Sequence, residues 1–289
     1  MSLVSAHFDI DILAQSSIVH REDYSTVGTD NFALFRREKI ITPTGDVTQV
    51  PIVSGSSFRG ILRRIGEALT ATVLDYEDAA LPIPAAHLLS NGGRLAKSAR
   101  PLTDEEERSL KALIPQIAVF GGAASGRIMS GLLTVGKVLP EIAELAHLLP
   151  RPPRNTHLPA AVLGVAEESF THLSDHRTDT SHSPIVDSDE TSSPLGRFGI
   201  ETLPAGTRLQ TWVRLDNATT LQAAFLRDVL AEFALRGHLG GRIAAGHGQV
   251  TATVSATVLR GHLPADDADW AAELSASRQD AISALHQLS

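Results

Sequence analysis

The chain has 289 residues, of which 43% are hydrophobic and 20% charged, so it is expected to form a packed globular fold rather than a disordered chain. It contains no cysteine, which excludes disulfides and thiolate metal sites and agrees with a reducing cytoplasm, where we expect the protein. The formal net charge of −8 argues against nucleic-acid binding through overall charge, so any such binding depends on where the basic residues lie.

Apolar and polar residues alternate over residues 6–12, which predicts a half-buried first strand. His7, Asp9 and Asp11 share its polar face. They could form a metal site, but we expect a solvated face. The N-terminus lacks a basic region, so we expect no signal peptide, and no apolar run reaches the length of a membrane span.

Residues 15–49 are polar and are predicted to form a long loop. Near its end, basic side chains interleave with apolar ones: Arg36, Arg37 and Lys39 with Phe32, Phe35 and Ile40. Aromatic rings beside arginines can form a base-stacking surface, and they can equally anchor a hairpin to the core. The sequence leaves both interpretations open.

Residues 50–64 read VPIVSGSSFRGILRR, an extended start, a Gly/Ser turn and the beginning of a helix. Apolar residues continue at helical spacing to about Leu74. Ser54 or Ser56 can cap this helix, and the unpaired N–H groups of its first turn attract anions such as phosphate. Arg59 lies where the helix dipole disfavours a cation, unless an anion binds beside it. The alternative is an ordinary capped helix with solvated arginines.

Residues 75–115 look like an insertion, broken by prolines and by a Gly-Gly turn, with a short helix that ends before Pro115. Residues 117–138 are rich in glycine, including Gly121 and Gly122, and contain Arg127. Glycines let a ligand approach the backbone closely, but they also occur in plain strand connections. The stretch is no Walker loop, because no Gly-Lys-Ser/Thr closes it.

Pro140 is predicted to start a helix, and residues 160–170 a strand. Residues 171–197 are rich in Ser, Thr, Asp and His and form an exposed excursion between two strands. Its histidines do not predict a metal site, because the segment lacks the helical period that would place them on one side.

The remaining elements are a strand over 208–215, an amphipathic helix over 219–236, a glycine-rich loop, a strand over 250–258 and a C-terminal helix from Asp269. Strand, helix and strands followed by strand, helix and strand is the order of an α+β, ferredoxin-like or RNA-recognition fold. A sheet of this kind can carry RNA across one face.

Three stretches, in order, resemble one known family. PIVSGSSFRGILRR is similar to the P-G-S-S-L-R-G signature of the RAMP superfamily, in particular of the backbone subunits of CRISPR effector complexes. FGIETLPAGT (198–207) is similar to the family's F-x-x-E-x-x-P-x-G-T segment before a late strand. LGGRIAAGHGQV (239–250) resembles its glycine-rich loop.

The resemblance implies a palm formed by residues 1–74, 116–170 and 198–262, with an inserted region at 75–115. It implies a thumb hairpin at 171–197, which kinks guide RNA and touches a neighbouring subunit, and a C-terminal helix at 263–289. The implied protein is a non-catalytic subunit that polymerises head-to-tail along CRISPR guide RNA, beside other effector subunits, and reaches its target nucleic acid through guide pairing. The lack of an aspartate that matches a catalytic motif, together with the overall size, favours a type IV complex. We expect no cofactor, metal or membrane association.

The expected RNA-binding residues combine the basic positions with the serines and glycines of the motifs. They are Arg36, Arg37, Lys39, Ser56, Ser57, Arg59, Arg63, Gly121, Gly122, Arg127, Arg177, Arg242 and His247.

Two alternatives remain from the sequence. Relatives that cleave their target use an aspartate in the loop after the first strand, where Asp23 and Asp30 are the candidates for a metal-dependent RNA endonuclease. A small-molecule enzyme on the same scaffold lacks a visible nucleophile and base, because Ser57 has no His–Asp partner nearby in sequence and His247 lies between glycines.

Overall fold

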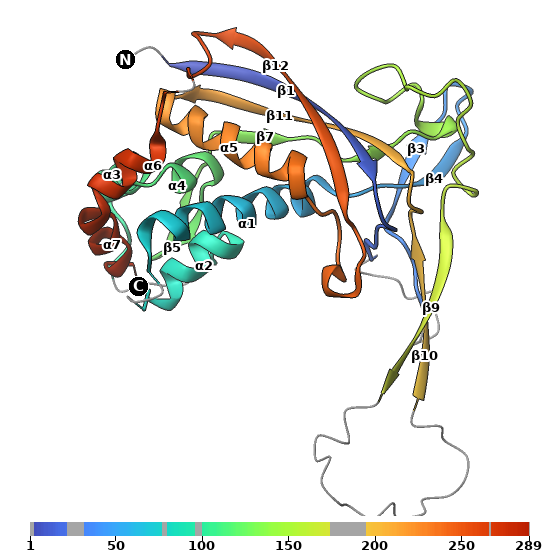
Figure 1. Ribbon diagram of the computed structural model, residues 1–289, viewed down its shortest axis with the longest axis horizontal. Coiled ribbons are helices and arrows are strands. Elements are labelled where there is room, and N and C mark those ends of the chain that lie inside the picture. The colour runs from blue at the N-terminus through green and yellow to red at the C-terminus, as the bar shows by residue number, and fades with distance from the viewer. Residues whose placement is uncertain are drawn as a thin grey trace, which may run out of the picture.

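The computed structural model describes residues 3–21, 32–76, 80–95, 100–173, 195–265 and 267–288 (Figure 1). Arg177 and the aspartates Asp23 and Asp30 lie outside these residues, as does most of the segment predicted to form the thumb. The chain is a mixed α+β protein, as predicted.

The centre of the molecule is an antiparallel sheet. Its strands lie in the order β12 (Val250–Arg260), β1 (Val4–Ala14), β11 (Arg208–Ala218) and β7 (Leu133–Val135), and β8 (Leu139–Pro140) also pairs with β11. In β1, Ala6, Phe8, Ile10 and Ile12 are buried and the residues between them are partly exposed, which confirms the predicted half-buried strand.

Two long helices, α1 (Gly55–Leu74) and α5 (Thr220–Arg236), cover one face of this sheet (Figure 1). α1 begins at the predicted serine, since the Ser54 hydroxyl accepts from the Ser57 N–H at 3.2 Å. α5 begins with a capping box of Thr219 and Gln222. The rings of Phe58 and Phe233 meet edge to face at 5.3 Å and join the two helices in the core.

The shorter helices gather at one end of the molecule (Figure 1). They are α2 (Ile83–Asn91), α3 (Asp104–Leu113), α4 (Pro115–Phe120), α6 (Trp270–Ala276) and α7 (Arg278–His286). The expected single C-terminal helix is therefore two helices, which meet at Ser277. The rings of Phe225 and Trp270 meet edge to face with their centres 5.0 Å apart, and this contact ties α6 to α5.

Three hairpins complete the described part of the chain: β3 (Arg37–Ile41) with β4 (Val47–Pro51), β5 (Gly122–Ala124) with β6 (Arg127–Met129), and β9 (Ala166–Leu173) with β10 (Leu195–Thr202). β2 (Phe32–Ala33) pairs with β10. The β9–β10 hairpin extends away from the body (Figure 1). The predicted loop at 15–49 thus contains a hairpin and several bridges.

The helix predicted from Pro140 is wrong. Pro140 belongs to β8, and only a 3-10 turn, Ala143–Leu145, follows. Ile142 and Leu145 pack with Val50 and Ile52 in a small second core beneath the 139–164 segment. The apolar spacing therefore reflects this local core rather than a helix. None of the helices in the described ranges is long and apolar enough to cross a membrane.

Two glycines of α1 give a matched test of this packing. A Cβ atom at Gly66 would lie 2.8 Å from the Phe225 ring, whereas a Cβ at Gly60 meets nothing within 4 Å. Gly66→Ala should therefore lower the free energy of unfolding by about 1–3 kcal/mol through overpacking. Gly60→Ala should raise it by up to about 1 kcal/mol through helix propensity. Urea unfolding of the RNA-free protein measures both, and changes of the same sign would contradict this packing.

Candidate nucleic-acid interface

The three family-like motifs meet at one short extended segment, residues 18–21. Ile18 exchanges backbone hydrogen bonds with Leu203 of the second motif, at 2.8 and 3.0 Å. The Gly241 N–H of the glycine loop donates to the Val19 carbonyl at 2.8 Å. The Ser54 N–H, at the start of the signature helix, donates to His20 Nε2 at 3.2 Å. Motifs that lie far apart in the sequence thus meet at one place in the fold.

The start of α1 is the centre of this site. Ser56 is exposed, Ser57 is half-buried, and the hydroxyls of Ser54 and Ser56 lie 3.1 Å apart. No acidic residue occupies the first turn of the helix. Its positive end therefore meets no carboxylate from that turn, an environment that favours a bound anion. The predicted contacts of Ser56 and Ser57 with RNA remain predictions that fit this geometry.

Arg59 and Arg63 of the same helix point into the protein instead. Arg59 donates to the carbonyls of Leu133 and Phe120. Arg63 is 7% exposed and donates to the carbonyls of Gly121, Phe120 and Leu88 at 2.8, 2.9 and 3.2 Å. Burial, together with the nearby charge of Arg59, lowers the pKa of Arg63 to about 10, so it stays charged at neutral pH. This placement argues against the expected RNA contact of Arg63 and gives both arginines a structural role.

The glycine-rich stretch after α4 serves the same internal packing. Gly121 has a positive φ of +57°, and a Cβ atom there would lie 2.3 Å from the Met129 carbonyl oxygen. At Gly122 the added atom would lie 2.4 Å from a methyl of Leu88. Arg127 pairs with Asp104 at 2.6 Å and with Glu107, both on α3. The structure therefore gives these residues contacts within the protein, and their expected contacts with RNA stay predictions.

The three basic residues at the start of β3 lie in different environments. Arg37 holds Glu201 of the second motif through two contacts of 2.9 Å, and the same carboxylate accepts the Phe35 N–H at 2.8 Å. Arg36 is half-buried and its N–H donates to the His20 carbonyl. Lys39 is exposed. Phe35 is fully buried, so the patch anchors a hairpin to the core, which was one of the two interpretations left open.

The glycine loop contacts the base of the β9–β10 hairpin. The Arg242 guanidinium lies 3.6 Å from the centre of the Phe170 ring, which in turn stacks on Phe198 at 5.6 Å. His247 Nδ1 lies 3.0 Å from the Ser17 hydroxyl and 3.9 Å from Glu168. A hydrogen bond from Ser17 lowers the pKa of Glu168 and, with one from Thr202 and the charge of His247, outweighs the effect of burial.

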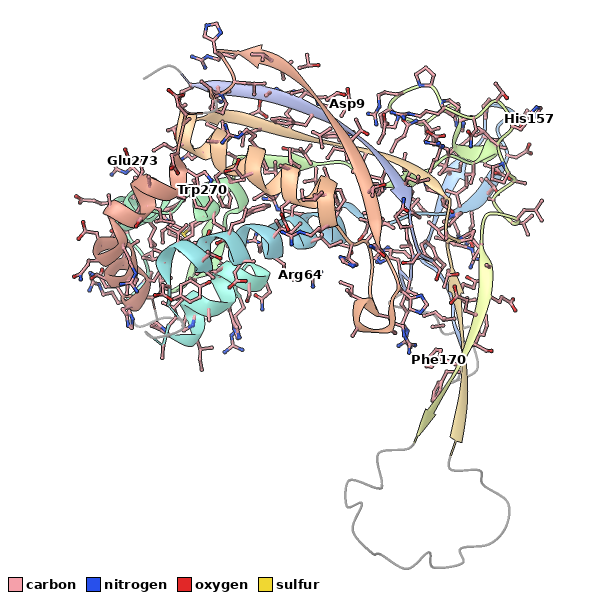
Figure 2. All side chains as sticks on the ribbon, viewed as in Figure 1. Asp9, Arg64, His157, Phe170, Trp270 and Glu273 are labelled. Atoms are coloured by element: carbon pink, nitrogen blue, oxygen red, sulfur yellow. The ribbon has the colours of Figure 1, made fainter. Side chains whose placement is uncertain are left out.

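Arg242 is exposed although it covers Phe170, so a cation and two aromatic rings form a stack near the surface, with Phe170 labelled in Figure 2. Such surfaces bind nucleic-acid bases by stacking and cation–π attraction. The sequence indicated Arg242 but missed Phe170, because an aromatic residue within a strand carries no signal of its own. His20 and the exposed Arg64, beside Arg63, were missed in the same way.

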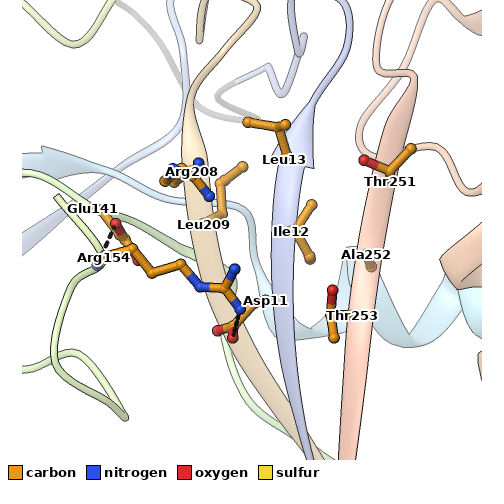
Figure 3. Close-up of a pocket in the computed structure, with 10 residues that line it drawn as sticks. All are labelled: Asp11, Ile12, Leu13, Glu141, Arg154, Arg208, Leu209, Thr251, Ala252 and Thr253. Atoms are coloured by element: carbon orange, nitrogen blue, oxygen red, sulfur yellow. Dashed lines mark hydrogen bonds and ion pairs between the residues drawn. The ribbon is translucent and has the colours of Figure 1, made fainter.

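The open face of the central sheet is partly occupied by the chain itself. Arg151 contacts Asp9 at 2.5 Å and Asp11 at 2.6 Å. Arg154 contacts Asp11 at 2.9 Å (Figure 3). His7 stacks on Trp212, with ring centres 5.5 Å apart. The face that was expected to be solvated therefore carries an ion-pair network within the protein. The described residues contain no cluster of acidic and histidine side chains that could hold a metal.

A small cavity of about 190 Å³ lies beside this network (Figure 3). Arg154 and Arg208 line it together with Glu141, which is buried and accepts from the Gln210 side chain at 2.8 Å. Both signs of charge are present: Arg154 pairs with Asp11, and Glu141 also accepts the Arg154 backbone N–H at 3.2 Å. The cavity therefore belongs to the packing of the 151–154 segment on the sheet.

The fold and the converging motifs define a protein of the RAMP superfamily. The model of that superfamily matches residues 25–251, so the chain belongs to it, and the resemblance read from the sequence is confirmed. Among solved structures, a chain described as "Type IV-B CRISPR Complex" is 58% identical. That match covers 93% of this chain and 99% of the other, with a TM-score of 0.63. No curated protein sequence matches.

Neighbouring arginines on α1 test the structural role of Arg63. Arg63→Ala leaves the carbonyls of Phe120 and Gly121 without their donor, and we expect it to lower the free energy of unfolding by about 2–4 kcal/mol. Arg64→Ala changes an exposed side chain in the same turn and should stay within about 0.5 kcal/mol of the wild type. Equal effects of the two changes in urea unfolding would contradict the inward placement.

The ion-pair network predicts a pH effect. Burial alone would raise the pKa of Asp11, but the hydrogen bonds from Arg151 and Arg154 outweigh it and lower that pKa. The charged carboxylate therefore stabilises the fold above its unfolded pKa of about 4, and this contribution is lost as the pH falls through the lower folded pKa. Asp11→Asn should lose about 1–2 kcal/mol of unfolding free energy near pH 7, and this loss should shrink as the pH falls below about 4. A difference that does not change with pH would contradict the network.

Proposed function

We propose that this protein is a non-catalytic backbone subunit of a type IV CRISPR effector complex that binds guide RNA. The observation that carries the proposal is the 58% identity, over 93% of the chain, to a chain of a solved Type IV-B CRISPR complex. The convergence of the three motifs on residues 18–21 supports it, because it brings an exposed helix start, a glycine loop and a basic hairpin to one side of the fold.

The central sheet and its two long helices would form the palm. The chain order β1, α1, β7, β11, α5, β12 with the sheet order β12-β1-β11-β7 supports a ferredoxin-like arrangement. In this proposal the palm comprises residues 1–74, 116–170 and 198–262, with 75–115 as the inserted region and 263–289 at the C-terminus. The extended β9–β10 hairpin would carry the thumb, 171–197, to the RNA and to the next copy (Figure 1).

RNA would pass the start of α1, with Lys39 on one side and the Arg242–Phe170 stack on the other. Only 4% of the residues are aromatic, so phosphate contacts and backbone N–H groups, rather than base reading, would supply most of the affinity. This suits a subunit that must coat any guide sequence and leave its bases free to pair with a target.

Copies would assemble head-to-tail on the RNA, since such a contact does not close on itself and the RNA length then sets the copy number. Other effector subunits would complete the particle, which we expect to work in the cytoplasm.

The test is RNA binding by purified protein over a range of salt concentrations. Single-stranded RNA should convert the protein into a larger particle, with an affinity that falls steeply with salt. Lys39→Ala and Arg242→Ala should each weaken binding, and the loss of a phosphate contact should flatten the salt slope by about one unit. Arg100→Ala, an exposed cation beside α3, is the matched control and should bind as the wild type does.

A monomer that does not respond to RNA at low salt would overturn the proposal. The guide-loaded particle should also leave a labelled complementary RNA intact in magnesium. Cleavage that disappears in Asp23→Ala or Asp30→Ala would favour the endonuclease alternative instead.

A further inference from the structure

β12 forms an uncovered edge of the central sheet. In the part of the chain that the structure describes, β1 is its only strand partner, and Figure 1 shows it at the outer side of the sheet. Residues 250–259 carry no charge and no proline, the devices that usually protect an edge strand. Its outer half is exposed on both faces, with Val258 at 44% and Leu259 at 50%. The backbone N–H and C=O groups along such an edge can pair with another strand.

The sequence of this edge is nearly the same in both directions. Residues 250–258 read VTATVSATV, and reversal only exchanges Thr253 with Ser255. Two copies that pair antiparallel about Val254 therefore place like residues opposite each other. The pairs are Val250 with Val258, Thr251 with Thr257, Ala252 with Ala256, and Thr253 with Ser255. Threonine and serine pairs across antiparallel strands stabilise a sheet through their hydroxyls.

The placement of the side chains on the two faces of β12 is compatible with this register. Ala252, Val254 and Ala256 stand opposite Ile12, Ile10 and Phe8 of β1, whose side chains are buried under the helices. Beside them lies an apolar groove of about 500 Å³, lined also by Leu230 and Ala234 of α5 and by Leu263. A two-fold axis perpendicular to the sheet keeps α1 and α5 of both copies on one side. The second strand would then bring its own alanine and valine side chains over this groove.

We propose that two RNA-free copies of this chain pair through β12, antiparallel about Val254, to form a symmetric dimer with one continuous sheet. Both copies use the same surface, so the contact closes on itself and cannot build a filament. It is therefore distinct from head-to-tail assembly on RNA, and an experiment without RNA tests it separately.

Cysteine cross-linking tests the register, because the natural chain has no cysteine. Val254→Cys places two thiols directly opposite each other across the axis, and oxidation should give a covalent dimer. Ala252→Cys faces Ala256 of the other copy, so its own thiols lie about 13 Å apart, beyond the reach of a disulfide. It should stay monomeric on a denaturing gel, and the double variant Ala252→Cys/Ala256→Cys should cross-link. No cross-link at any position, or equal cross-linking at all of them, would overturn the proposal.

Charge substitutions test the same contact in solution. Thr253→Lys/Ser255→Lys sets like charges opposite each other, as does Thr253→Glu/Ser255→Glu, and each variant should sediment as a monomer. Their mixture should form a one-to-one dimer. Thr134→Lys, an exposed threonine of β7 at the other edge of the sheet, should dimerise as the wild type does. A wild-type monomer at up to about 100 µM, ample for a contact of micromolar affinity, would overturn the proposal.

Discussion

The backbone of residues 18–21 is the connection on which the candidate site depends. Successive residues of this segment form hydrogen bonds with different elements: Ile18 with Leu203, and Val19 with Gly241. The His20 side chain accepts from the N–H at the start of α1, and the His20 carbonyl accepts from the Arg36 N–H. Buried backbone groups need such partners, since an unpaired one costs as much as a lost hydrogen bond. The segment therefore fixes the positions of the helix start, the glycine loop and the basic hairpin relative to one another.

Several arginines of this chain bind carbonyls or carboxylates of the protein itself. Arg59 and Arg63 hold the carbonyls after α4, Arg37 holds Glu201, and Arg127 and Arg151 hold carboxylates. Among the residues that the structure describes, Arg21, Lys39 and Arg242 are exposed cations of the site, in a chain whose net charge is −8. A phosphate at this surface would meet backbone N–H groups and a helix dipole as well as charged side chains. The candidate site is therefore a small area around the start of α1 and not a broad basic face.

The long periodic elements were predicted correctly because their signal is local. The alternation in β1 and β12 and the apolar stripe of α5 need no knowledge of distant residues. The β3–β4 hairpin stayed one of two open interpretations, and a helix was wrongly predicted at Pro140, because there the outcome depends on pairing with other segments. Pro140 lies opposite Leu209, and Ile142 packs in the second core with Val50. Short elements with few local hydrogen bonds take the structure that their neighbours allow.

The sequence by itself determined the order of the long strands and helices, a serine cap for α1 at Ser54 or Ser56, and the three motifs that mark the RAMP superfamily. Only the tertiary structure decided which side chains of those motifs face inward. Arg63 and Arg64 are adjacent and identical, yet one is buried on three carbonyls and the other is exposed. Successive residues of a helix point about 100° apart, and what each meets is supplied by α2 and α4, tens of residues away in the chain. The residues that each arginine contacts therefore cannot be predicted from the sequence of the helix alone.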